Sequence, residues 1–113
     1  MHKINFEILG KKWVLRVLKK KRYNKSNGND SVAITYPNKR RIDIGPAGMD
    51  LETVLHELTH AYLTELCTKS TELDDVQLEE IFAELLAKRG REMLDLGDKL
   101  YAQICALTAA KIT

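Results

Sequence analysis

The sequence has few of the residues that cross-link a fold or anchor it in a membrane. Only two cysteines, Cys67 and Cys105, occur in 113 residues, and they fall on separate predicted helices. So few thiols argue against a cysteine-rich structural zinc site, and in a reducing compartment we expect both as small buried hydrophobes. No apolar run approaches the length that crosses a bilayer, and the N-terminus lacks the apolar core of a signal peptide. We therefore expect a cytoplasmic protein with no membrane partner.

The composition is that of an ordinary globular protein. Hydrophobic residues make up 44% of the chain and charged residues 30%, which excludes a disordered or membrane protein. We expect residues 1–113 to form one domain, because this length supports a single core but no separate substrate-binding lobe.

Histidine is also scarce, yet two of the three histidines lie four residues apart around a glutamate. His56, Glu57 and His60 form the sequence HExxH inside a predicted helix. Four residues of helix turn through about 400° and rise about 6 Å, so both imidazoles project from one face and can bind one zinc ion. Glu57, beside that face, is the residue type that takes a proton from a metal-bound water. The alternative is a plain solvated face, opposite an apolar stripe of Leu51, Leu55, Leu58, Tyr62 and Leu66.

A catalytic zinc ion usually has three protein ligands, so a third is expected elsewhere. His2 lies at the start of the chain and is a poor candidate. Glu80 and Glu84 share one face of a later predicted helix, where their like charges repel unless a cation or a histidine lies between them. We expect Glu80 as the third ligand, although Glu79 remains an alternative because helix register is coarse at this stage.

These motifs carry a resemblance to a known class of enzymes. HExxH followed by a glutamate on a later helix resembles the gluzincin branch of zinc metallopeptidases. The segment 80–84 looks like the third-ligand helix of the anthrax-lethal-factor-like zincins, and the segment 54–62 is similar to small zincins of phages and mobile elements. The resemblance covers about residues 40–91. It implies one Zn²⁺ ion held by His56, His60 and Glu80, with Glu57 as general base and Glu84 orienting a histidine.

One part of that pattern is missing. Lethal-factor-like enzymes place a tyrosine shortly before the third ligand to stabilise the oxyanion, and residues 68–79 contain none. Tyr36, Tyr62 and Tyr101 are available elsewhere, but Tyr62 belongs to the apolar stripe and is expected in the core.

Positive and negative charges are segregated along the chain. Residues 1–48 hold twelve Lys and Arg against three Asp and Glu, and the rest hold six against thirteen. Clusters at 19–25 and 39–41 suit nucleic acid or an acidic partner, but a basic sheet facing acidic helices, with solvated lysines in the loops, is the simpler explanation. The expected function is peptide-bond hydrolysis of a protein or peptide substrate. The alternative is a non-catalytic zinc-binding module that docks through its basic half.

The expected fold is α+β and zincin-like, with a small, mostly antiparallel sheet followed by an HExxH helix, a third-ligand helix and a C-terminal helix. We expect strands at residues 4–8, 13–18, 32–36 and 40–44, a polar loop at 19–31, and the last strand at the sheet edge beside the active-site helix. The expected helices are 50–67 with Asp50 as N-cap, 74–89 capped by Asp74 or Asp75 and ended by Gly90, and 91–110.

Overall fold

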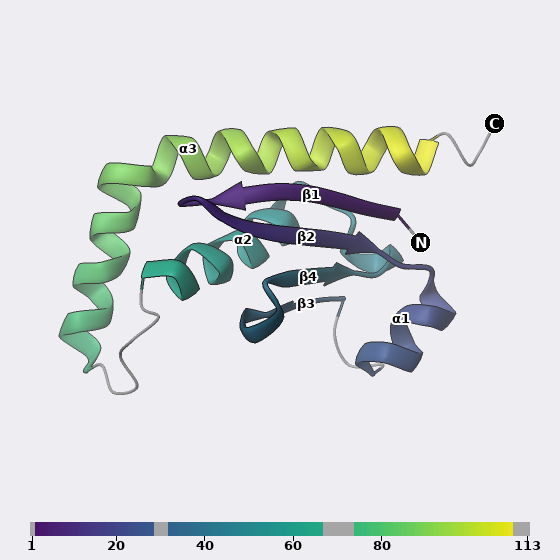
Figure 1. The fold of residues 1–113 in the computed structure, drawn as a ribbon, viewed down its shortest axis with the longest axis horizontal. Helices are drawn as coiled ribbons and strands as arrows, with labels where there is room; N and C mark the ends of the chain where they lie inside the picture. The colour runs from purple at the N-terminus through teal and green to yellow at the C-terminus, as the bar shows by residue number, and fades with distance from the viewer. Residues whose placement is uncertain (1, 29–31, 67–73, 110–113) are drawn as a thin grey trace.

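Four strands form one mixed sheet, which a computed structural model describes together with the helices over residues 2–28, 32–66 and 74–109. The strands are β1 (His2–Ile8), β2 (Lys11–Val17), β3 (Ala33–Tyr36) and β4 (Arg41–Ile44), and their order in the sheet is β1-β2-β4-β3. The pairs β1–β2 and β3–β4 are antiparallel, whereas β2–β4 is parallel. The predicted α+β class and the four strands are therefore confirmed (Figure 1).

Strand alternation builds the first hairpin. Ile4, Phe6 and Ile8 face the core, and their polar neighbours face the opposite side. Leu9 and Gly10, with φ of 51° and 78°, connect β1 to β2. A two-residue turn with both φ angles positive matches the twist of the strands that it joins.

The position of the edge strand differs from our expectation. β4 lies inside the sheet, because it pairs with β2 on one side and with β3 on the other. The strand at this edge of the sheet is therefore β3, and β1 forms the opposite edge. After β2 the chain leaves a gap of one strand before it forms β3. It then turns back, and β4 fills the gap between β2 and β3.

The expected loop at residues 19–31 is also wrong, because Lys20–Asn27 form the helix α1. Tyr23, with 2% of its surface exposed, is the one buried residue of this helix. Gly28, at a φ of 86°, ends α1 by donating its N–H to the carbonyl of Asn24 at 3.0 Å. A single buried aromatic side chain gives no apolar periodicity, so the sequence pattern did not indicate a helix.

The helix α2, which carries the HExxH sequence, spans Leu51–Leu66 and begins as predicted. The Asp50 carboxylate accepts the N–H of Thr53 at 2.7 Å, which makes Asp50 the N-cap. Two short 3₁₀ helices, Pro37–Lys39 and Pro46–Gly48, flank β4. The predicted end of α2 at Cys67 lies outside the described residues.

A single 35-residue helix, α3 (Asp75–Ala109), replaces the two helices that we expected after α2. Asp74 caps it, because its carboxylate accepts the N–H of Gln77 at 2.8 Å and the Gln77 side chain accepts the N–H of Asp74 at 3.0 Å. Gly90 does not end the helix. It is buried in a stripe that continues through the second part of α3: Gly90, Met93, Gly97, Leu100 and Ile104.

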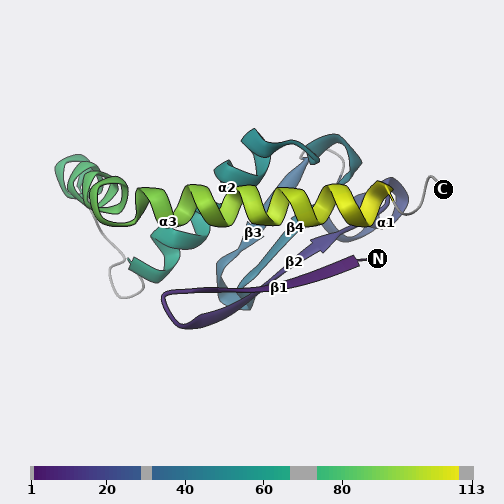
Figure 2. The same ribbon diagram turned by 90° about the horizontal axis from the view of Figure 1, so that it is seen from above.

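That stripe packs α3 against α2 and β1 (Figures 1 and 2). α2, α3 and the core-facing side chains of the sheet share one hydrophobic core. The two helices approach closely at Gly97, where a Cβ would overlap the side chain of Leu55. Figure 1 also shows a bend in α3, which turns its first part away from the direction of the second. Glycine costs about 1 kcal/mol in a helix, and the packing of this stripe offsets that cost.

Candidate metal centre

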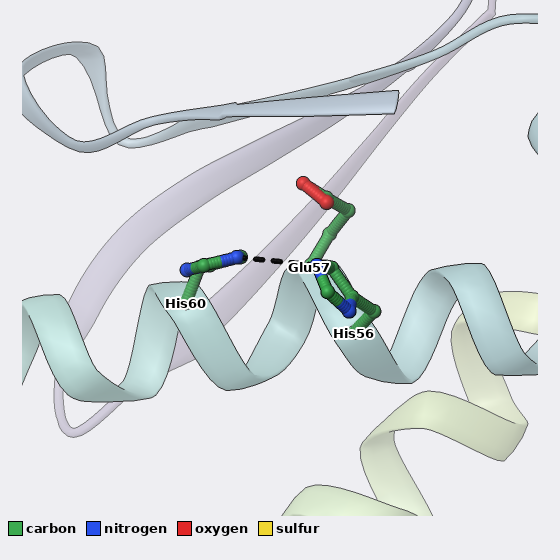
Figure 3. A group of neighbouring side chains, drawn as sticks. All are labelled: His56, Glu57 and His60. Atoms are coloured by element: carbon green, nitrogen blue, oxygen red, sulfur yellow. Dashed lines mark hydrogen bonds between the residues drawn. The ribbon is translucent and has the colours of Figure 1, made fainter. Parts of the chain in front are cut away.

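The two histidines of the HExxH sequence converge on one point in front of α2. Both are exposed, and their Nε2 atoms lie 3.3 Å apart (Figure 3). Tetrahedral zinc with Zn–N bonds of 2.0–2.1 Å places two ligating nitrogens about 3.3–3.4 Å apart. The spacing of His56 and His60 therefore fits two bonds to one zinc ion, and imidazole nitrogen is a donor that zinc prefers.

Glu57 lies next to the histidines but, unlike them, is buried, with 5% of its surface exposed. Its side chain points from α2 toward the β3–β4 side of the molecule (Figure 3). The hydroxyl of Thr35, on β3, lies 3.1 Å from Glu57 Oε1 and 3.2 Å from the Glu57 carbonyl oxygen. The alternative interpretation, a plain solvated face, would leave Glu57 exposed. The structure buries it instead, because the edge strand covers that side of α2.

A groove of about 330 Å³ contains this group. One wall is α2 and the other is the edge of the sheet with the 3₁₀ turn after it. The groove is lined by Ala33, Ile34, Thr35, Pro37, His56, Glu57, His60 and Thr64. Within the described sheet β3 pairs only with β4, so its other side presents backbone N–H and C=O groups along the groove.

The structure does not bring the predicted third ligand to the histidines. In the described part of the chain, the one group of metal-binding side chains is His56, Glu57 and His60. Glu80 is exposed on the first part of α3, and Glu84 pairs with Lys88 at 2.8 Å instead of orienting a histidine. Glu79, the alternative third ligand, is exposed as well. The cause is the unbroken α3, whose first part extends beyond the core that its second part shares with α2.

The remaining candidates are not part of the group either. Tyr62 is buried as predicted, and its hydroxyl donates to Glu92 at 2.7 Å. Burial and this hydrogen bond raise the pKa of Tyr62, so it stays protonated. Tyr36 bonds Asn27 on α1. Cys105 is exposed on α3, which corrects the expectation that it is buried.

Our sequence argument missed Thr35. The alternation of β3 places Thr35 on the face that pairs with Ile42, which is 0% exposed and in the core. A hydroxyl on the core-facing side of a strand needs a hydrogen-bond partner. That requirement is the signal that could have identified the residue.

The basic half of the chain is not neutralised by the acidic helices. Among the described residues, one ion pair joins the two halves: Arg40 to Glu65, at 2.7 Å. Trp13 Nε1 also donates to Glu65, at 2.9 Å. Burial alone would raise the pKa of Glu65, but the hydrogen bonds from Arg40 and Trp13 outweigh it, so the pKa lies below the ordinary 4.5. Contact between the basic sheet and the acidic helices therefore accounts for one ion pair, and the lysines of residues 1–48 are exposed to solvent.

Comparison with known proteins adds no further assignment. The chain matches no family model, no curated protein and no solved structure. Among the described helices, none has the length and apolarity of a membrane span. The chemistry of the groove must therefore be argued from its own side chains.

Proposed function

We propose that the protein is a zinc-dependent peptidase of the gluzincin type, with His56 and His60 as zinc ligands and Glu57 as general base. The observation that carries this proposal is the 3.3 Å separation of the two Nε2 atoms beside a buried carboxylate. Beside the two imidazoles, a buried carboxylate is a residue type that can take a proton from a metal-bound water. Zinc at such a pair would supply a Lewis acid and lower the pKa of a bound water molecule toward 7.

The protein's own contribution is the placement of the base. Thr35 holds one carboxylate oxygen of Glu57, Oε1. In the described part of the chain no group donates to the other oxygen, Oε2, which is left to accept a proton from water. Glu57 would then deliver that proton to the leaving amine of the substrate. The exposed edge of β3 supports a peptide substrate, because an extended peptide can add to a sheet edge through backbone hydrogen bonds.

The third ligand in this proposal is Glu80, which has to move to reach the histidines. Zinc binding would favour this movement, because each ligand bond would stabilise the bound conformation and not the free one. Glu84 would follow on the same face of α3 and exchange Lys88 for a histidine.

Metal analysis of two variants tests the proposal. Glu57→Gln should keep stoichiometric zinc and lose peptidase activity, because the amide cannot accept the proton. His60→Ala should lose the zinc as well. Peptide cleavage by Glu57→Gln at the rate of the unaltered protein, or a protein that takes up no zinc when it is supplied, would refute it.

A second candidate, a zinc-stabilised module that binds nucleic acid, is favoured by the charges. Nine of the twelve basic side chains in residues 1–48 form no ion pair with a described residue: Lys3, Lys11, Lys12, Lys19, Lys20, Lys21, Arg22, Lys25 and Lys39. DNA binding that weakens steeply with salt, is unaffected by Glu57→Gln and occurs without peptidase activity would select this candidate.

A further inference from the structure

The first fifteen residues of α3, which we call the α3 arm (residues 75–89), leave apolar side chains uncovered. The arm contains one buried residue, Leu85, at 0% exposure. Seven large hydrophobic side chains are strongly exposed among the described residues, and four of them are in the arm: Val76, Leu78, Phe82 and Leu86, at 67, 46, 44 and 50% exposure. Apolar surface concentrated in this way marks an interaction site.

Three of these residues form a ridge. Leu78, Phe82 and Leu86 are spaced by four residues, so they follow one another along one side of the helix. Leu85, which faces the body of the protein, lies beside the ridge and not on it. At about 100° per residue, Leu85 lies about 60° around the helix from Phe82. The contact with the body is therefore made beside the ridge, and the three ridge side chains remain 44–50% exposed.

Charges at the two ends of the arm match this ridge. At about 100° per residue, Asp75 and Arg89 both lie within about 20° of the direction of Phe82. Asp75 precedes Leu78 by three residues, and Arg89 follows Leu86 by three. Phe82 is the middle residue of the arm. If the direction of the helix is reversed about Phe82, the apolar residues of the ridge fall on apolar residues. Asp75 and Arg89 then exchange places, so opposite charges meet.

We propose that the α3 arm is a homodimer interface, in which the arms of two copies pack antiparallel about a twofold axis at Phe82. Phe82 then meets its own copy, Leu78 meets Leu86, and Asp75 meets Arg89, twice in each dimer. This is the self-complementary contact that twofold symmetry requires. A parallel arrangement would instead place like charges opposite one another at both ends.

In the monomer, Asp75 and Arg89 are available to form ion pairs across a dimer. Arg89 bonds Glu92 at 3.2 Å, and both side chains are about half exposed, so the present pair contributes little. Asp75 forms no ion pair with a described residue. A single pair of fifteen-residue helices buries a small interface, so the dimer should form reversibly at micromolar concentrations and above.

Light scattering coupled to size exclusion tests the dimer across about 10 μM to 1 mM protein. The mass should rise from 12.9 kDa toward twice that value. Phe82→Asp should remain monomeric, whereas the charge reversal Asp95→Arg, on α3 but outside the arm, should leave the dimer intact. A protein that is monomeric over the whole range, or a dimer that survives Phe82→Asp, would overturn the proposal.

Two charge reversals test the antiparallel register. Asp75→Arg alone and Arg89→Asp alone should each dimerise more weakly than the unaltered protein, because each places like charges opposite one another. Mixed in equal amounts, the two variants should form a heterodimer, since both of its end pairs are then attractive. The double variant should dimerise by itself. Circular dichroism checks that each variant is folded, and a mixture of folded single variants that stays monomeric contradicts this register.

Discussion

The contact between Thr35 and Glu57 should be measurable as stability, independently of any metal. Glu57 has 5% of its surface exposed, and the Thr35 hydroxyl lies 3.1 Å from its Oε1. A hydrogen bond to a charged group contributes about 1.5–3 kcal/mol, and a buried acceptor left without a donor costs a similar amount. Thr35→Val keeps the shape of the side chain and removes the donor. It should lower the free energy of unfolding by about 1–3 kcal/mol.

The measurement is urea denaturation in the presence of a chelator, so that zinc contributes nothing. Thr35→Ser is the control, because it keeps the hydroxyl and loses one methyl group, worth about 0.8 kcal/mol. Glu57→Met removes the carboxylate but keeps the Glu57 carbonyl oxygen, 3.2 Å from the Thr35 hydroxyl, so Thr35→Val should cost less in that background than in the unaltered protein. If valine and serine at position 35 were equally destabilising, or if the two changes were additive, the hydroxyl would not be holding the carboxylate.

Three further changes test other parts of the structure. Gly97→Ala should cost about 1–3 kcal/mol in thermal unfolding, because its Cβ overlaps Leu55, whereas Gly90→Ala, which only touches one methyl group at 4.0 Å, should not destabilise. The folded pKa of Glu65 is lowered from 4.5, so its stabilisation is present above that pH and is lost as the pH falls through the folded value. Urea denaturation from about pH 6 to pH 3 should therefore show a smaller loss in Glu65→Gln, and parallel profiles would contradict this. Glu80→Gln should weaken zinc binding at least tenfold in a chelator competition, and an unchanged affinity removes Glu80 from the ligands.

Local patterns predicted β1 and β2 because buried residues alternate with less buried ones along each of these strands. In β1, every second residue from Ile4 to Ile8 is apolar and buried, and a shift by one residue would expose all of them. The parallel pair between β2 and β4 was not predictable in the same way. It depends on how the chain crosses between distant strands, and no alternation within one strand encodes that choice.

The predictions for the helices were wrong where tertiary contacts outweigh the local sequence pattern. α1 has a single buried side chain, Tyr23, so tertiary contact stabilises a segment whose own pattern is polar. Gly90 suggested a helix end from local propensity alone. It is buried in line with Met93 and Gly97, so the packed stripe of α3 outweighs the local preference of one glycine.

The candidate site was predicted to the extent that it lies on one helix. The spacing of His56 and His60 fixes their separation through helix geometry, so no tertiary information was needed. The burial of Glu57 and its contact with Thr35 depend on the edge strand, which is distant in sequence. The same holds for Glu80, whose distance from the histidines depends on the direction of the whole arm.

The arm has two roles in these proposals, and its two faces keep them separate. At about 100° per residue, Glu80 and Glu84 lie on the side of the helix roughly opposite Phe82. Dimerisation through the ridge therefore leaves both glutamates free, and movement of the arm toward the histidines leaves the ridge exposed. Phe82→Asp should abolish the dimer without changing zinc affinity, whereas Glu80→Gln should weaken zinc binding without changing the mass. A variant on either face that changed both properties would show that the arm positions its ligand only within the dimer.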